Sequence, residues 1–225
     1  MAEINYSFFV IMAIILKNGE CFLHIPKTGG SFITHVLNET GLIRKKIGYH
    51  KHLDWTRICY FPQTHHKILS RLNFSLVKFY YPTSFCFVRH PIAWYESFWN
   101  YCNQSSVNWK VFGSVRNWHP CFKLAEHYDT NFNAFVKKIL TNQPGYVSEL
   151  YSMYAHPQID FVGKTENLTQ DLLIFLRKQN YKIEEQFFYQ QDKVNVSQKE
   201  RIIWDNSLKD EVLDSEKMAL LRYSY

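Results

Sequence analysis

Short apolar runs alternate with amphipathic stretches along most of the chain. Two apolar runs, 21–25 and 84–88, have the length of buried strands, and residues 159–168 predict a third strand followed by a turn. Apolar residues at helical spacing predict helices over 31–40, 63–73, from Pro91 onward, 131–140, 169–179 and 208–221. The alternation of strands and helices predicts an α/β fold with a central, mainly parallel sheet flanked by helices.

The chain has an apolar segment near its start. Residues 6–16 are apolar, and we expect a terminal strand or a docked segment there, with membrane association as the alternative. The run is shorter than the about 20 residues of a membrane-spanning helix, and no Lys or Arg precedes it as in a signal peptide. No repeat or long linker is present, so we expect one domain over 1–225, in which 1–19 form an N-terminal extension or the first strand.

The composition narrows the possible ligands. The net charge of +6 suits an anionic ligand, but without a basic run it does not favour nucleic acid. The five cysteines form no CxxC pair, so neither a zinc site nor a redox motif is indicated. Reduced thiols and a cytoplasmic location are the simplest expectation.

The residues that favour ligand binding are concentrated just after the first buried strand. Pro26 interrupts the strand, and Gly29 and Gly30 allow tight backbone angles that bring main-chain N–H groups close to a ligand. Ser31 is placed to cap the following helix. A strand, a glycine turn and a helix N-terminus together favour an anion, because the N–H groups and the helix dipole attract negative charge. Lys27 adds a full positive charge.

The order of these residues separates the loop from the Walker A type. There the lysine follows the glycines, whereas here it precedes them. The string His-Ile-Pro-Lys-Thr-Gly-Gly-Ser, residues 24–31, resembles the 5′-phosphosulfate loop of sulfotransferases that use 3′-phosphoadenosine-5′-phosphosulfate (PAPS), in their carbohydrate-type, sulfotransferase family 2-like branch. The resemblance implies that the cofactor is bound by Pro26, Lys27, Thr28, Gly29, Gly30, Ser31 and Phe32.

A second candidate follows the strand over 84–88. Arg89 is placed at the strand end, Pro91 suits the first turn of a helix, and Ser97 lies about two turns into that helix. A guanidinium binds phosphate through two parallel hydrogen bonds, and a hydroxyl adds a neutral donor. This segment resembles the 3′-phosphate segment of the same sulfotransferases, which implies that Arg89 and Ser97 bind that phosphate. The alternative is a strand–helix junction with an ion-paired arginine. Because the carboxyl ends of parallel strands meet at one edge, we expect Lys27 and Arg89 to lie together.

Two histidines lie in the polar and basic stretch 41–56. His50 and His52 are two residues apart and so share one side of an extended segment. The resemblance implies that a histidine of such a segment is the base for the acceptor hydroxyl. His52 is the first candidate and His50 the second; a role for neither is the remaining alternative.

A late segment, Phe-Val-Gly-Lys-Thr-Glu-Asn-Leu over 161–168, resembles a Val-Gly-Arg/Lys-x-Glu-x-Leu pattern of carbohydrate sulfotransferases. The resemblance implies that Lys164 and Thr165 approach the nucleotide; the alternative is a plain turn from strand to helix. Residues 103–130 are expected to be an irregular insertion that either lines a sugar cleft or is a packed loop.

The resemblance covers about residues 20–225 and implies a P-loop-like sulfotransferase fold. It implies transfer from PAPS to a hydroxyl, expected on a carbohydrate, with PAP as the product and without a metal. Nucleic acid and membrane are not expected partners, and the oligomeric state is open. One rival is a catalytically inactive module that binds PAP or a glycan but lacks a working base. Another is a nucleotide phosphotransferase, which needs a Walker lysine that the sequence lacks.

Overall fold

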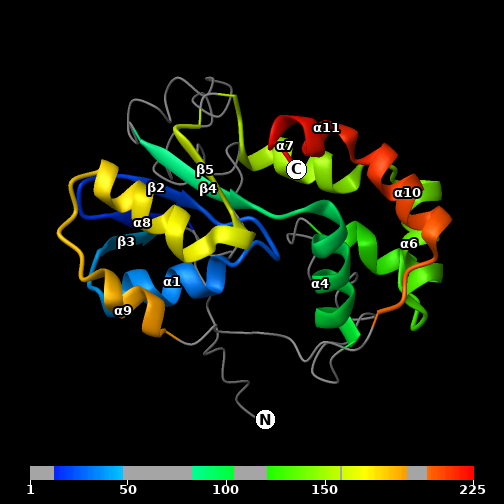
Figure 1. Cartoon of the computed structure of the whole chain (residues 1–225), viewed down its shortest axis with the longest axis horizontal. Helices are drawn as coiled ribbons and strands as arrows, with labels where there is room; N and C mark the ends of the chain where they lie inside the picture. The colour runs from blue at the N-terminus through cyan, green and yellow to red at the C-terminus, as the bar shows by residue number, and fades with distance from the viewer. Residues whose placement is uncertain (1–12, 48–82, 104–120, 158, 192–201) are drawn as a thin grey trace, which may run out of the picture.

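A five-stranded sheet lies at the centre of the computed structural model, which describes residues 13–47, 83–103, 121–157, 159–191 and 202–225 (Figure 1). Within these residues the strands are β1 (Ala13–Leu16), β2 (Cys21–Leu23), β3 (Ile43–Ile47), β4 (Ser84–Val88) and β5 (Phe161–Lys164). They lie side by side in the order β3-β1-β2-β4-β5. The three strands predicted from apolar runs are present as β2, β4 and β5.

The sheet is mixed, so the prediction of a mainly parallel sheet is correct only on one side. β2, β4 and β5 are parallel neighbours, but β1 is antiparallel to both β2 and β3. The cause is the hairpin between β1 and β2, where Gly19 has φ +102° and the Leu16 N–H donates to the Glu20 carbonyl oxygen at 2.9 Å. So short a connection joins only antiparallel strands. β1 confirms a terminal strand for the last part of 6–16; the first part lies outside the described residues.

Helices pack against both faces of the sheet. They are α1 (Gly30–Glu39), α4 (Pro91–Asn103), α6 (Phe132–Asn142), α7 (Tyr146–Tyr154), α8 (Leu168–Lys178), α9 (Glu185–Gln190), α10 (Asn206–Ser215) and α11 (Lys217–Arg222), with 3-10 helices η2 (Phe122–His127) and η3 (Thr165–Asn167). Figure 1 shows α1, α8 and α9 grouped apart from α4, α6, α7, α10 and α11. None of the helices in the described ranges is long and apolar enough to cross a membrane.

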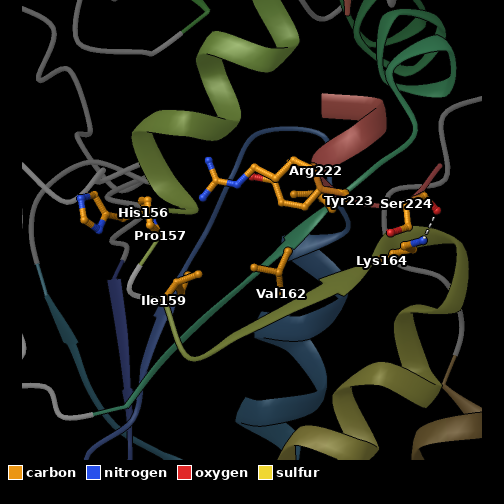
Figure 2. A pocket seen from close by; sticks show the side chains of 9 residues that line it. His156, Pro157, Ile159, Val162, Lys164, Arg222, Tyr223 and Ser224 are labelled. Atoms are coloured by element: carbon orange, nitrogen blue, oxygen red, sulfur yellow. Dashed lines mark hydrogen bonds between the residues drawn. The ribbon is translucent and has the colours of Figure 1, made fainter. Parts of the chain in front are cut away.

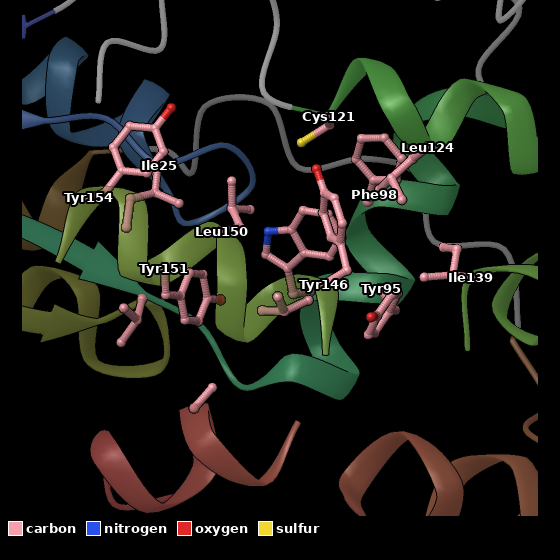
Figure 3. Packing of buried hydrophobic residues seen from close by; sticks show 14 of the residues in the cluster. Ile25, Tyr95, Phe98, Cys121, Leu124, Ile139, Tyr146, Leu150, Tyr151 and Tyr154 are labelled. Atoms are coloured by element: carbon pink, nitrogen blue, oxygen red, sulfur yellow. The ribbon is translucent and has the colours of Figure 1, made fainter. Parts of the chain in front are cut away.

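Each group of helices closes its own apolar cluster, because alternate strand residues point to opposite faces of the sheet. The α8 cluster comprises Ile14, Leu16, Phe22, Phe32, Ile33, Val36, Leu37, Leu42, Phe85, Phe87, Leu172, Leu173, Phe175, Leu176 and Phe188. The α4 cluster, on the other face, is larger and richer in polar-tipped rings (Figure 3). Its members include Leu23, Ile25, Trp94, Tyr95, Phe98, Phe135, Tyr146, Leu150, Tyr151, Tyr154 and Val212.

Most predicted helices are present, with one correction. The helices predicted over 31–40, after Pro91, and over 131–140 and 169–179 correspond to α1, α4, α6 and α8. The helix predicted over 208–221 is instead two helices, because the chain turns at Glu216. The carboxylate of Glu216 points into the protein and accepts from the backbone N–H groups of Val147 and Ser148. The sequence predicts no element at α7, α9 or β3, and the helix predicted over 63–73 lies outside the described residues.

Candidate anion-binding site

The loop between β2 and α1 has a strained backbone. Lys27 has φ +65° and Gly29 has φ +82°, both in the left-handed region. For a residue with a Cβ this conformation costs about 1–2 kcal/mol, so neighbouring contacts must hold Lys27 in it. Gly29 is the N-cap of α1, and no side chain of the described residues caps the helix there. The prediction that Ser31 is the cap is wrong, because the helix begins at Gly30 and Ser31 lies within its first turn.

Side chains of the protein bind three carbonyl oxygens of this loop. The hydrogen bonds run from Thr28 Oγ1 to Ile25 O at 3.0 Å, from Trp94 Nε1 to Pro26 O at 2.9 Å, and from Arg89 Nη1 to Lys27 O at 3.4 Å. Carbonyl oxygens repel anions, so these bonds remove negative partial charge from the loop surface. The N–H groups in the first turn of α1 have no acceptor within the helix and can donate to a negatively charged ligand.

Packing requires both glycines, and at Gly29 the left-handed backbone requires glycine as well. A Cβ at Gly30 would lie 2.0 Å from Cδ2 of His24, whose buried ring fills the space below the start of α1. A Cβ at Gly29 would lie 2.6 Å from Cδ2 of Leu168 in α8. Sequence reasoning assigned both glycines to the approach of a ligand. The structure adds His24 and Leu168 as reasons for their small size.

Arg89 follows β4, and its backbone is fixed on both sides. Its N–H donates to Tyr151 Oη at 3.0 Å, and the Tyr151 hydroxyl donates to the Arg89 carbonyl oxygen at 2.7 Å. Burial lowers the pKa of the Arg89 guanidinium, while the nearby carboxylates of Glu166 and Glu96 partly raise it. Among the described residues, however, none forms an ion pair with Arg89. A partly desolvated cation that forms no direct ion pair, and whose charge the nearby carboxylates offset only in part, is a favourable place for an anion.

One face of α4 meets the loop. The Nζ atom of Lys27 lies 4.2 Å from the centre of the Tyr101 ring, and Trp94, two turns earlier, binds the loop through its indole N–H. Helix residues three, four and seven positions apart share a face. Ser97 therefore lies on the side of α4 that faces the loop, half-buried between Trp94 and Tyr101. This placement is compatible with the predicted pairing of Ser97 and Arg89.

The side chains of Lys164 and Thr165 contact β4 and residues 224–225. Thr165 Oγ1 donates to the Val88 carbonyl oxygen at 2.9 Å and so ties the end of β5 to β4. Lys164 Nζ donates to the Ser224 carbonyl oxygen at 2.9 Å and lies 4.6 Å from the centre of the Tyr225 ring. The described contacts of both side chains are therefore with β4 and residues 224–225, not with the loop that contains Lys27.

The other predicted site residues divide into three cases. The Phe32 side chain packs in the α8 cluster, so only its backbone amide is suited to a ligand. Pro26 has no N–H, and Trp94 occupies its carbonyl oxygen, so it shapes the loop rather than binding. His50 and His52 lie outside the described residues.

Within the described ranges, no group of three or more His, Cys, Asp or Glu side chains is arranged to hold a metal ion.

Sequence reasoning missed four residues that build the site: Trp94, Tyr101, Tyr151 and Glu166. Glu166 accepts from the His90 backbone N–H at 2.8 Å and from the Tyr225 hydroxyl at 3.0 Å. The helical spacing of Trp94 and Tyr101 around Ser97 was a usable signal. The contacts of Tyr151 and Glu166 join segments more than 50 positions apart, and no local pattern marks them.

Comparison of the chain with protein-family models, with curated proteins and with solved structures gave no match. Function is therefore inferred from the loop, Arg89 and α4, together with the two sequence motifs.

Proposed function

We propose that this protein is a sulfotransferase that moves a sulfuryl group from PAPS to a hydroxyl of an acceptor, expected to be a carbohydrate. The observation that carries the proposal is the contact between Arg89 and the loop. The Arg89 guanidinium donates to the Lys27 carbonyl oxygen, so two cationic residues lie at one edge of the sheet. PAPS carries phosphate at both the 5′ and the 3′ position of its ribose. Two neighbouring anion-binding groups suit such a molecule, and their order along the chain resembles that family.

The residues take roles that follow from charge and position. Arg89 would hold the 3′-phosphate through two parallel hydrogen bonds, with the Ser97 hydroxyl as a neutral donor. Lys27 and the first-turn amides of α1 would stabilise negative charge on the sulfuryl oxygens and on the leaving phosphate. Thr28 would act through its backbone, because its hydroxyl donates to Ile25. The left-handed Lys27 is held by contacts to the loop carbonyls, which preorganises the site at the cost of local strain.

PAPS supplies an activated sulfuryl group: the acceptor oxygen bonds to sulfur as the bond from sulfur to the 5′-phosphate oxygen breaks, and PAP is released. The hydroxyl proton goes to a base on the protein. By resemblance we assign this role to His52, with His50 as the second candidate.

Arg89 provides the sharpest binding test. Calorimetry should compare PAP with adenosine 5′-phosphate, which lacks the 3′-phosphate. We expect wild type to prefer PAP, and Arg89→Ala to lose about 2–3 kcal/mol of PAP binding while its affinity for adenosine 5′-phosphate changes little. Arg177→Ala is the matched control, because this exposed arginine on α8 pairs with Glu185, away from the loop. Equal affinity of wild type for both nucleotides would show that Arg89 does not read a 3′-phosphate.

The rate of sulfate transfer from labelled PAPS across a panel of hydroxyl acceptors separates the remaining alternatives. In that assay Lys27→Ala and His52→Ala should retain PAP binding and lose about 10²–10⁴-fold in rate, with His50→Ala less affected. The opposite ranking of the two histidines would make His50 the base. Selective PAP binding without transfer to any acceptor would identify an inactive binding module, and phosphate transfer from a nucleoside triphosphate would identify a phosphotransferase.

A further inference from the structure

A pocket of about 350 Å³ lies beside β5, on the side where α7 and α11 end (Figure 2). Its apolar wall includes Val88 at the end of β4, Val162 in β5 and Ile159 just before β5. Lys164 and Arg222 contribute a cation each, and Figure 2 shows them at different ends of the pocket. The volume is at the lower end of the about 300–1,000 Å³ that is usual for sites of small organic molecules.

The charge in this pocket is not balanced. Lys164 donates to the Ser224 carbonyl oxygen, and Arg222 donates to the Ala155 carbonyl oxygen. Neither side chain forms an ion pair in the part of the chain that the structure describes, and no Asp or Glu lines the pocket. Carbonyl groups satisfy some donors of these cations but leave the positive charge uncompensated. A negatively charged group would therefore be attracted to the pocket.

Tyr223 lines the pocket and holds an unsatisfied hydroxyl donor. Its hydroxyl is shielded from solvent and has no hydrogen-bond partner among the described residues. Burial raises the pKa of Tyr223 to about 12, so the hydroxyl keeps its proton at neutral pH. A buried hydroxyl without a partner is costly. A ligand with an acceptor oxygen would satisfy it once a movement of the pocket lining exposes the hydroxyl.

We propose that this pocket binds a small organic anion, with an apolar body against Val88, Ile159 and Val162 and an acidic group at Arg222. The site is separate from the one proposed for PAPS. The Arg89 side chain turns toward the residues that follow β2, whereas the pocket extends along β5, and these two strands lie on opposite sides of β4. The inference does not depend on sulfotransferase activity, because it uses none of the residues of the loop.

The test uses three matched probes and the full-length chain. Calorimetry should show saturable binding of 4-ethylbenzoate with a Kd of roughly 1 mM or tighter. The neutral 4-ethylbenzamide and inorganic sulfate should each bind at least about tenfold more weakly, since one lacks the charge and the other lacks the apolar body. Arg222→Gln should weaken 4-ethylbenzoate about tenfold, and Arg222→Lys should retain most of the affinity. Lys178→Gln, an exposed cation on α8, is the control and should have no effect.

The possible results are easily told apart. Absence of saturable binding, equal binding of acid and amide, or the same affinity in Arg222→Gln would each overturn the proposal. Displacement of 4-ethylbenzoate by PAP would also overturn it, because the pocket would then be part of the donor site. Binding that persists at saturating PAP supports a second site. If Arg222→Gln proves unstable, Ile159→Ser tests the apolar wall, and unchanged affinity in that variant would contradict the proposal equally.

Discussion

The two faces of the sheet are built differently. In the α8 cluster apolar rings pack directly on one another: Phe85 and Phe175 stack with their ring centres 3.9 Å apart. In the α4 cluster, whose buried tyrosines Figure 3 shows, rings also carry directional bonds. Trp94 Nε1 donates to the Pro26 carbonyl oxygen, and the Tyr151 hydroxyl donates to the Arg89 carbonyl oxygen. Apolar contact stabilises without fixing direction, whereas a hydrogen bond fixes both partners. The α4 face therefore positions the candidate site, and the α8 face mainly stabilises the sheet.

Glu216 is a second example of a buried polar group that joins helices on the α4 face. Its fully buried carboxylate accepts from the Tyr95 hydroxyl at 2.7 Å, from the Val147 and Ser148 N–H groups at 2.9 and 2.7 Å, and from the Ser148 hydroxyl at 2.7 Å. These bonds join α10 and α11 to the start of α7 and to α4. A buried carboxylate is tolerated only when it is so fully hydrogen-bonded. The helix that carries Tyr151, and through it Arg89, is thus anchored by a polar contact.

The largest effect is expected in the α8 cluster. Phe175→Ala should lower the free energy of unfolding by about 3–5 kcal/mol, because it opens a cavity among apolar rings. Urea denaturation measures this loss. PAP affinity of the folded fraction should stay near that of wild type, since Phe175 makes no described contact with the loop. Ile174→Ala, one position along α8 and 43% exposed, is the control and should cost less than about 1 kcal/mol. A selective loss of PAP affinity in Phe175→Ala would contradict the division between the two faces.

A smaller but more specific effect is expected on the α4 face. Trp94→Phe keeps most of the ring and removes the donor to the buried Pro26 carbonyl, at a cost of about 1–3 kcal/mol in stability. It should also weaken PAP binding, because the loop loses one of the contacts that hold Lys27 left-handed. Trp99→Phe is a matched control on the same helix, since the Trp99 indole N–H donates to the backbone carbonyl oxygen of Asp129 at 3.0 Å, away from the loop. Equal PAP affinity in the two variants would mean that Trp94 does not position the loop.

The parts of the fold that could be predicted are those with local causes. Apolar runs of strand length and residues at helical spacing gave β2, β4, β5 and the neighbouring helices. The meeting of Lys27 and Arg89 followed from one rule, that parallel strands present their carboxyl ends at the same edge, and the hydrogen bond between them confirms it. The antiparallel position of β1 was missed although Asn18-Gly19 is a hairpin signal.

The parts that could not be predicted depend on pairs distant in sequence. The neighbours of Glu216 in the sequence are mainly polar, so no local sequence pattern indicates that it is buried. Its burial is explained only by its hydrogen-bond partners on α4 and α7. The contact of Lys27 with Tyr101 depends on where α4 crosses the loop. The pocket near Arg222 arises from three segments that share no motif.

The smallest effect concerns pH and the start of α4. His90 is the N-cap residue: its carbonyl oxygen accepts from Trp94 N–H at 2.9 Å and its Nδ1 accepts from Ile92 N–H at 3.2 Å, which requires an unprotonated Nδ1. Burial lowers the pKa of His90, and Lys209 lowers it further, while Glu166 and Glu96 oppose the shift. A histidine whose pKa is lower in the folded state than in the unfolded chain favours folding in its neutral form. Its contribution is therefore complete above the unfolded pKa of about 6.5 and decreases as the pH falls below that value.

Wild-type stability in urea should therefore decrease between about pH 6.5 and pH 5 by more than that of His90→Asn, which keeps a capping acceptor and does not titrate. The extra loss should be at most about 1 kcal/mol, the usual value of an N-cap hydrogen bond. The pKa of His127 is also lowered by burial, but this group titrates equally in both proteins and cancels in the difference. Parallel pH profiles for the two proteins would show that protonation of His90 does not disturb the start of α4. A steeper loss in wild type would place a pH-sensitive cap beside Arg89, on the face of the sheet that positions the site.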